Sequence, residues 1–307
     1  MLDKTSLTST ATKTLGNRAK WLKTYIEEAE FFEKVLDSDV SQLPTGSHLV
    51  EIGSGIGLLS LNLASRGFIV TAFEPQASGF NEMHQMRDLV TNNWKGLLPK
   101  INFSDISVNE LTKLDLPADY VFAINVIEHV QDYRTLIHDG LNQATSQGVF
   151  RIICPNYSIP YEPHFEIPVF ISKKLTFRVF RRKIEQSEIP KSKEFWQDLS
   201  WPTQRELKRY LKSEGLEFEF SREATNFYVN RALSDSNFIN RKGLIFGSLI
   251  KGFALLAKSL TRFIPLSLIP IIDCRIKKST KETSRELKDY SLRDGKSNKD
   301  GCDEQSS

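Results

Sequence analysis

The stretch VEIGSGIG at residues 50–57 decides the fold of this chain. It joins a short apolar strand to a stretch of helical spacing, and Gly53, Gly55 and Gly57 stand in the connection. Glycine adopts positive φ angles without strain and lets the backbone approach a ligand closely. The first N–H groups of the following helix have no acceptor within that helix, so they can bind a polar or anionic group. This arrangement predicts a cofactor site, although the same loop also suits a dinucleotide or a plain turn.

Strand-like and helix-like stretches alternate after this loop. Short apolar or β-branched stretches predict five strands, and helical spacing predicts the helices between them. The expected strands cover residues 48–52, 68–73, 101–103, 120–125 and 148–154. Such alternation predicts an α/β fold, with a doubly wound and mostly parallel sheet that carries helices on both faces. Ligands of these sheets bind at the carboxyl ends of the strands.

Three acidic residues stand at successive strand ends. Glu51 lies one residue before the end of the first strand, Glu74 ends the second, and Asp105 follows the third. A carboxylate at the position of Glu74 can accept hydrogen bonds from both hydroxyls of a ribose, as in dinucleotide folds. Asp105 is placed to meet an adenine amino group. Each residue alone is equally a solvated carboxylate or a helix cap, but the series favours a cofactor that contains a nucleoside.

Four short motifs together resemble a known family. VEIGSGIG, FEP at 73–75, SD at 104–105 and NVIEHV at 125–130 are similar to the class I (Rossmann-like) S-adenosylmethionine-dependent methyltransferases. More narrowly, they resemble the subgroup that contains the ubiquinone-biosynthesis methyltransferases. The resemblance covers roughly residues 46–156 and implies a seven-stranded sheet with an antiparallel final hairpin. It also implies an enzyme whose cofactor is S-adenosyl-L-methionine.

The resemblance assigns roles to individual residues. It implies that Glu51 and the glycine loop hold the methionine part of the cofactor, that Glu74 holds the ribose, and that Asp105 holds the adenine. Asn125 and Val126, at the end of the fourth strand, are expected to line the cofactor near its sulfur.

The same motifs leave two points open. Glu128 and His129 match the Glu-His pair of the family, in which His129 is expected to be structural rather than catalytic. Leu58 stands where dehydrogenases have a third glycine, which favours the methyl donor over NAD. An NAD-linked oxidoreductase on the same fold and a catalytically degenerate cofactor-binding module remain as alternatives.

Methyl transfer to a hydroxyl requires alignment of donor and acceptor, exclusion of water and removal of a proton. A base is expected in residues 154–168, a proline-rich and therefore stiff loop after the fifth strand. His164 is the candidate base, since an unperturbed histidine has a pKa of about 6.5; a loop histidine bonded to a backbone carbonyl is the other interpretation. Tyr157 and Tyr161 are candidate substrate-binding residues. No metal ligand set is expected, and the expected acceptor is a hydroxyl of a small molecule, glycan or lipid precursor.

Composition divides the 307 residues into segments. We expect a disordered amino-terminal segment, a methyltransferase domain with an insertion on the substrate side, an apolar amphipathic helical segment and a disordered tail. These segments cover, in order, residues 1–17, 18–235 (insertion at 155–200), 236–276 and 277–307. The late strands of the domain are expected at 216–220 and 226–230.

The charge of the chain argues against nucleic acid as a partner, because a net charge of +3 is too small to indicate one. Three separated cysteines fit free thiols in a reducing compartment, so a cytoplasmic location is expected.

Residues 167–184 carry six basic residues and no acid, and residues 244–272 are strongly apolar with basic interruptions. Basic faces beside apolar ones are typical of helices at a membrane interface, so both segments predict peripheral association with an anionic membrane. The other interpretation is packing on the domain, with Lys and Arg at the rim.

Overall fold

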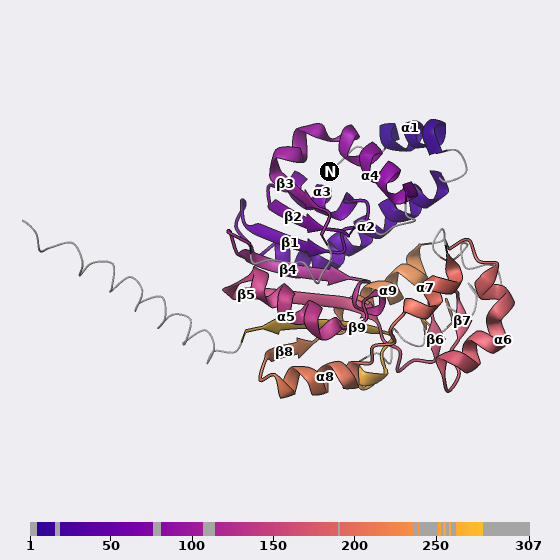
Figure 1. The fold of residues 1–307 in the computed structure, drawn as a ribbon. Coiled ribbons are helices and arrows are strands. Elements are labelled where there is room, and N and C mark those ends of the chain that lie inside the picture. Colours follow the sequence, from indigo (N-terminus) through magenta and orange to yellow (C-terminus); the bar gives the residue numbers. More distant parts are fainter. Residues whose placement is uncertain are drawn as a thin grey trace, which may run out of the picture.

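A computed structural model describes residues 5–15, 19–75, 81–106, 114–189, 191–235, 239, 251–252, 254–255, 258 and 262–278. The strands of its central sheet are β1 (His48–Ile52), β2 (Ile69–Phe73), β3 (Ile101–Ser104), β4 (Ala118–Ile124), β5 (Ala144–Pro155), β8 (Glu217–Phe220) and β9 (Ile271–Lys277). Their order is β3-β2-β1-β4-β5-β9-β8 (Figure 1). Strands β1 to β5 pair in parallel, whereas β9 runs antiparallel to both of its neighbours. The predicted seven-stranded, doubly wound α/β sheet is confirmed.

Helices cover both faces of the sheet, because successive residues of a strand point to opposite sides. In β1, Leu49 belongs to the core on one face and Val50 to the core on the other. The first core includes residues of α1 (Thr5–Leu15), α2 (Ala19–Val40), α3 (Leu58–Ser65), α4 (Asn81–Asn93) and α9 (Glu223–Ser234). The second core includes residues of α5 (Tyr133–Gln143) and α8 (Gln204–Ser213). This burial on both faces explains why the central strands are apolar throughout.

A smaller unit, residues 156–201, follows β5, and we call it the lid. It contains the antiparallel pair β6 (Tyr161–Glu162) and β7 (Ile167–Pro168), followed by α6 (Lys173–Glu185) and α7 (Ser192–Asp198). The lid has a small hydrophobic core of its own, to which Phe165, Ile184 and Trp196 belong. Figure 1 shows its elements grouped at one end of the sheet. Because the lid starts where β5 ends, this is the carboxyl end of the parallel strands, where ligands of such folds bind.

Helix α1 corrects the prediction that residues 1–17 are disordered. Residues 5–15 are helical, and Leu7 and Ala11, one turn apart, are buried in the first core. The helix contacts α2 and α4. A Thr- and Ser-rich composition disfavours an isolated helix, but tertiary packing of one apolar face supplies the stability that propensity lacks.

Helix α9 corrects the predicted strand at 226–230. These residues lie inside a helix of 12 residues. Its buried positions recur at helical rather than alternating spacing: Ala224, Thr225, Arg231 and Ala232. A short run of mixed apolar and polar residues fits both the spacing of a strand and that of a helix. Packing of α9 against α2 and β9 stabilises the helix.

Strand β9 is the last strand of the sheet along the sequence, although β8 is at the edge. It lies at the end of a segment that we expected to be helical over 236–276. Its partner β5 precedes it by more than a hundred residues, with Arg151 opposite Arg275 in the register. Pairing at such a distance leaves no local pattern in the sequence, which explains the wrong prediction. Most of the expected apolar helix and the expected disordered tail lie outside the described residues, so these two predictions stay untested.

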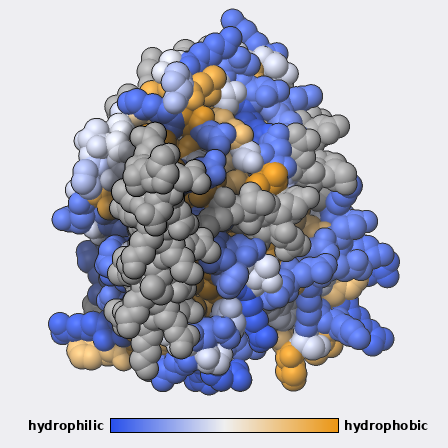
Figure 2. Space-filling view, turned by 60° about the vertical axis from the view of Figure 1, so that its left-hand side comes forward, coloured by the Kyte–Doolittle hydropathy of each residue, from blue (hydrophilic) through white to orange (hydrophobic). Residues whose placement is uncertain are grey.

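The surface drawn in Figure 2 is mainly hydrophilic, and its hydrophobic residues form separate patches. Among the residues that the structure describes, no helix combines the length and the apolar character that crossing a membrane would require.

A buried arginine ties four elements of the fold together. Arg151 in β5 is fully buried, and its Nε and Nη2 atoms each donate to the carboxylate of Asp273 in β9 at 2.9 Å. Its Nη1 atom donates to the backbone oxygen of Val35 and to the carboxylate of Asp39, both in α2 and both at 3.0 Å. Nη2 also reaches Glu223 of α9 at 3.1 Å. The guanidinium therefore joins β5 to β9, α2 and α9.

We expect Asp273→Asn to destabilise the protein strongly, because it removes the fully buried negative charge that accepts two hydrogen bonds from the Arg151 guanidinium. Breaking a buried ion pair from one side costs about 3–5 kcal/mol, and chemical denaturation monitored by circular dichroism measures the free energy of unfolding. Arg181→Gln is the control, because Arg181 forms an exposed pair with Glu185 on α6, and exposed pairs contribute about 0–1 kcal/mol. Equal stability of the two variants would show that the Arg151 network does not hold the sheet together.

Candidate active site

Three glycines give the loop after β1 a backbone that other residues rarely adopt. Gly53, Gly55 and Gly57 have φ angles of +77°, +54° and +78°. The N–H groups of Gly53 and Ser54 donate to the backbone oxygen of Phe73 at 2.8 and 3.0 Å, which fixes the loop to the end of β2. Gly57 is the residue that precedes α3, so the loop leads directly into the amino end of that helix.

Side chains from other strand ends approach the loop so closely that only glycine fits. A Cβ atom on Gly53 would overlap Cγ2 of Val126, and one on Gly57 would lie 2.6 Å from Cε1 of Phe103. Phe103 belongs to β3, and Val126 follows β4. Asn125, just before Val126, has a φ of +54°, a conformation that Asn tolerates better than most residues. The ends of β1, β3 and β4 therefore meet at this loop.

Two carboxylates border the loop, as the sequence analysis expected. Glu51 is buried and accepts a hydrogen bond from the hydroxyl of Ser60 in α3. Glu74 accepts a hydrogen bond of 2.8 Å from the N–H of Gly55. Burial raises the pKa of Glu51 to about 8, against the hydrogen bond from Ser60 and with the help of the nearby charge of Glu74. Burial also raises the pKa of Glu74.

The remaining residues test whether the loop fits a nucleoside cofactor. The hydroxyl of Ser54 is buried and has no hydrogen-bond partner among the described residues. A polar atom of a ligand would supply the missing hydrogen bond. Asp105 is half-exposed beyond β3 and forms an ion pair of 2.6 Å with Arg87 of α4, a contact that the sequence did not reveal. The open glycine backbone, the two carboxylates and the uncompleted hydroxyl fit a polar cofactor at this place.

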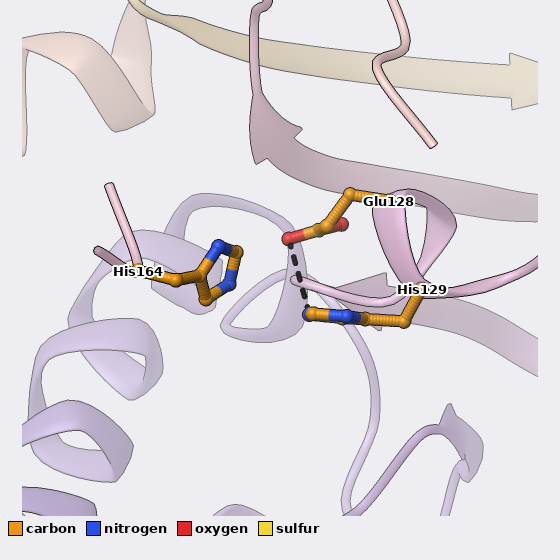
Figure 3. Close-up of side chains that lie close together, drawn as sticks. All are labelled: Glu128, His129 and His164. Atoms are coloured by element: carbon orange, nitrogen blue, oxygen red, sulfur yellow. Dashed lines mark ion pairs between the residues drawn. The ribbon is translucent and has the colours of Figure 1, made fainter. Parts of the chain in front are cut away.

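A second group of polar residues lies beside the loop. Glu128 and His129 belong to a 3₁₀ helix, η4 (Ile127–His129), two and three residues after Val126. The carboxylate of Glu128 is fully buried, and neither of its oxygens has a hydrogen-bond partner among the described residues. Figure 3 shows the ring of His164, from the lid, facing this carboxylate across from His129. Donor atoms of Glu128, His129 and His164 all lie within 4.8 Å of one another.

Burial sets the protonation of this cluster. It raises the pKa of Glu128 to about 7, while His164 acts in the opposite direction. Burial, together with the proximity of His164, lowers the pKa of His129 to about 3. The distance between Nε2 of His129 and Oε1 of Glu128 is 3.9 Å, longer than a hydrogen bond. His129 is therefore neutral near pH 7, whereas Glu128 changes its charge there.

Glu162 orients the histidine that the sequence proposed as the base. Its Oε1 atom lies 2.6 Å from Nδ1 of His164, and its Oε2 atom accepts the N–H of Phe165 at 2.7 Å. The hydroxyl of Tyr157 donates to the same carboxylate at 3.2 Å. Because a carboxylate accepts hydrogen bonds, the proton of the neutral His164 ring resides on Nδ1.

The two tyrosines expected to bind substrate differ in their surroundings. Tyr157 is buried, stacks on Trp201 with ring centroids 5.6 Å apart, and makes its polar contact with Glu162. Burial raises its pKa well above the usual range. Tyr161 in β6 is partly buried, and burial raises its pKa to about 12. Tyr157 thus contacts the orienting carboxylate, and a direct contact of either tyrosine with substrate stays a prediction.

The sequence analysis did not bring Glu128 and His164 together. It regarded His129 as structural and expected no metal ligand set, although the composition of the cluster also meets the donor requirements of a divalent cation. The signal available in the sequence was weak: a carboxylate at the end of the fourth strand and a histidine just after the fifth. Both positions face the same edge of the sheet.

Comparison with known proteins identifies the family. A family model described as a methyltransferase domain matches residues 25–219, from α2 to β8, which contain both the glycine loop and the Glu128 cluster. The chain belongs to this methyltransferase family. The predicted enzyme class, an S-adenosylmethionine-dependent methyltransferase with S-adenosylmethionine as its cofactor, is confirmed. The NAD-linked alternative is set aside.

Similar proteins agree with this family. The methyltransferase is 33% identical over 254 residues to an uncharacterised protein of Mycobacterium tuberculosis, a match that covers 82% of this chain and 85% of the relative. It is 31% identical over 122 residues to a ubiquinone biosynthesis O-methyltransferase of Rickettsia conorii, covering 40% of this chain and 37% of that protein. Its fold is similar to a phosphoethanolamine N-methyltransferase 2 of Haemonchus contortus, with a TM-score of 0.52, 14% identity and coverage of 90% and 61% of the two chains.

We expect Gly53→Ala to weaken binding of S-adenosylhomocysteine, because its Cβ would force the loop away from Val126. Overpacking of this kind costs about 1–3 kcal/mol, which corresponds to an affinity about 5- to 150-fold lower in calorimetry. Gly46→Ala is the matched control: Gly46 also has a positive φ, +89°, but open space around it. If both variants bound like the wild type, the loop would not be the cofactor site.

The raised pKa of Glu51 predicts a pH dependence of stability. The folded protein keeps this proton up to about pH 8, whereas the unfolded chain releases it above about pH 4.5, so the free energy of unfolding falls as pH rises between these values. Glu51→Gln removes this contribution, and we expect a shallower fall in urea denaturation between about pH 5 and about pH 8. The exposed Glu214→Gln should leave the slope unchanged. A Glu51→Gln slope equal to that of the wild type would contradict the buried, protonated state.

Proposed function

We propose that this methyltransferase transfers the methyl group of S-adenosylmethionine to a hydroxyl group of a small molecule, glycan or lipid precursor. One observation carries the proposal: a buried carboxylate, Glu128, has no hydrogen-bond partner among the described residues and faces His164 beside the glycine loop. An unpaired buried carboxylate costs several kcal/mol. A hydroxyl of the acceptor is the donor that would remove this cost, and its proton is the one that the reaction must remove.

The loop and strand ends would hold the cofactor. The backbone of Gly53, Gly55 and Gly57 and the carboxylate of Glu51 are proposed to bind its methionine part. Glu74, Asp105 and the pair Asn125–Val126 are proposed to bind the ribose, the adenine and the region near the sulfur. When bound, S-adenosylmethionine supplies an electrophilic methyl group on a sulfonium. The overlap that a side chain on Gly53 would make with Val126 places this loop next to the Glu128 cluster.

Glu128 and His164 would act on the acceptor. The pKa of Glu128, about 7, suits a group that must accept a proton at neutral pH. Glu128 and His164 would accept the proton that the acceptor hydroxyl loses when its oxygen receives the methyl group. The hydrogen bond between Glu162 and Nδ1 of His164 holds the ring in position for this step. The lid excludes water from the site, which keeps the carboxylate a stronger base than in solution.

We expect Glu128→Gln to lower kcat about 10²–10⁴-fold, the usual contribution of a general base. Below about pH 7 Glu128 is protonated and cannot accept a proton, so kcat/KM of the wild type should rise with pH and level off above about pH 7. The variant should lack this rise. Glu214→Gln, a change of the same kind at the exposed residue that follows α8, should keep the wild-type profile. A loss confined to KM would make Glu128 a binding residue.

The acceptor class is tested by incubating the enzyme and its Glu128→Gln variant with a methyl-labelled cofactor and with fractionated small molecules, glycans and lipids. We expect labelled methyl ether in one fraction with the wild type alone. Cofactor binding without transfer to any fraction would indicate the catalytically degenerate module. Loss of activity with a chelator, restored by a divalent cation, would assign Glu128, His129 and His164 to a metal site and contradict direct proton transfer.

A further inference from the structure

Helix α6 presents a row of apolar side chains to solvent. Four of the nine exposed large hydrophobic residues among the described part of the chain fall between residues 170 and 179. Ile171 is 99% exposed, Val179 55% and Leu175 42%. Leu175 and Val179 are four residues apart in α6 and so share one side of the helix, and Ile171 stands just before its amino end. The inner side of the helix is different, since Thr176 and Ile184 are buried against the rest of the lid.

A row of positive charges runs beside the apolar row. Lys174 and Arg178 are exposed, and each stands one residue before a member of the apolar row. Arg182 is also exposed and follows Arg178 by four residues, but it lies beyond a kink at Phe180, whose φ and ψ are not helical. Among the described residues, none of the three forms an ion pair.

The other basic residues of α6 have partners within the protein. Lys173 donates to the backbone oxygens of Gln197 and Leu199, and Lys183 donates to that of Glu166. Arg181 pairs with Glu185. The basic residues of the segment therefore divide into those with partners within the protein and the exposed set of Lys174, Arg178 and Arg182, which forms no ion pair among the described residues.

We propose that this outer face of α6, which we call the α6 face, binds the surface of an anionic lipid bilayer. Apolar side chains enter the headgroup region of a bilayer while neighbouring Lys and Arg attract its negative charge, and stable attachment requires both signals. The three apolar residues Ile171, Leu175 and Val179 are aliphatic, whereas the centres of protein interfaces are enriched in Tyr and Trp. A helix of 13 residues is also too small to bury the roughly 800 Å² per partner of a typical protein interface. The inference does not depend on which acceptor the enzyme methylates.

Co-sedimentation of the full chain with vesicles tests the α6 face. Vesicles of phosphatidylcholine alone and of phosphatidylcholine with phosphatidylglycerol give the neutral and anionic arms, each at low and high salt. We expect binding to the anionic vesicles at low salt, weakened by high salt because ions screen the exposed charges. Protein without vesicles provides the baseline for sedimentation.

Two triple variants separate the two signals. Lys174→Gln/Arg178→Gln/Arg182→Gln should lower the partition coefficient about 100-fold, since each basic residue near an anionic surface contributes about fivefold. Ile171→Ser/Leu175→Ser/Val179→Ser should lower it about tenfold or more through the lost apolar area. Matched controls are Arg205→Gln/Lys208→Gln/Lys212→Gln, which removes the same charge from exposed positions of α8, and Leu116→Ser, which removes another exposed apolar side chain. Circular dichroism confirms that each variant is folded.

Three results would overturn the inference. The first is a full-length protein that stays in the supernatant with anionic vesicles at low salt. The second is equal loss of binding in the α6 and α8 charge variants, or no loss in the apolar variant, because binding would then reflect general charge rather than this face. The third is a dimer in sedimentation velocity that the apolar variant dissociates without any lipid binding, which would assign the face to a second copy of the chain.

Discussion

The pairing of Arg151 with Asp273 is the interaction on which the rest of the architecture depends. Removing a guanidinium from water is costly, and the cost is recovered only where several acceptors surround it with good geometry. Here the acceptors come from segments far apart in the chain: Asp39 in α2, Glu223 in α9 and Asp273 in β9. Arg151 can be buried only because these carboxylates accept its hydrogen bonds, and the carboxylates are held in place by the same guanidinium. The charge thereby selects one position for β9 beside β5 and one position for each of the two helices.

A sheet held in this way also positions the candidate site. Strands β4 and β5 end side by side, and the segments that leave them carry Glu128 and His164. Ser200, at the end of the lid, closes the arrangement: its N–H donates to the backbone oxygen of Glu128 at 2.7 Å and its hydroxyl to that of Ile127 at 2.9 Å. The cluster thus rests on backbone hydrogen bonds between η4 and the lid. These backbone hydrogen bonds hold Glu128 in a buried position although its carboxylate has no hydrogen-bond partner among the described residues.

The sequence predicted what is decided locally. Strand, glycine loop and helix at 50–57, and the alternation that follows, leave their pattern in neighbouring residues, and the structure has the sheet that they imply. The ion pair of Arg151 with Asp273 and the proximity of Glu128 to His164 depend on contacts between distant segments. The spacing of neighbouring residues therefore does not predict them. The prediction for 226–230 failed for the same reason, since α9 is selected by its packing on α2 and β9. Glu51 and Glu74 border the loop as predicted, whereas the ion pair of Asp105 with Arg87 was not foreseen.

The lid joins two tasks that the sequence presented separately. Its inner residues hold His164 against Glu128 through Glu162, and its outer helix carries the aliphatic and basic rows of the α6 face. Two contacts connect these parts: Lys183 of α6 donates to the backbone oxygen of Glu166, two residues beyond His164, and Lys173 donates to the backbone oxygen of Gln197 in α7. The helix that carries the outer face is thus hydrogen-bonded at one end to the segment that carries His164 and at the other end to α7.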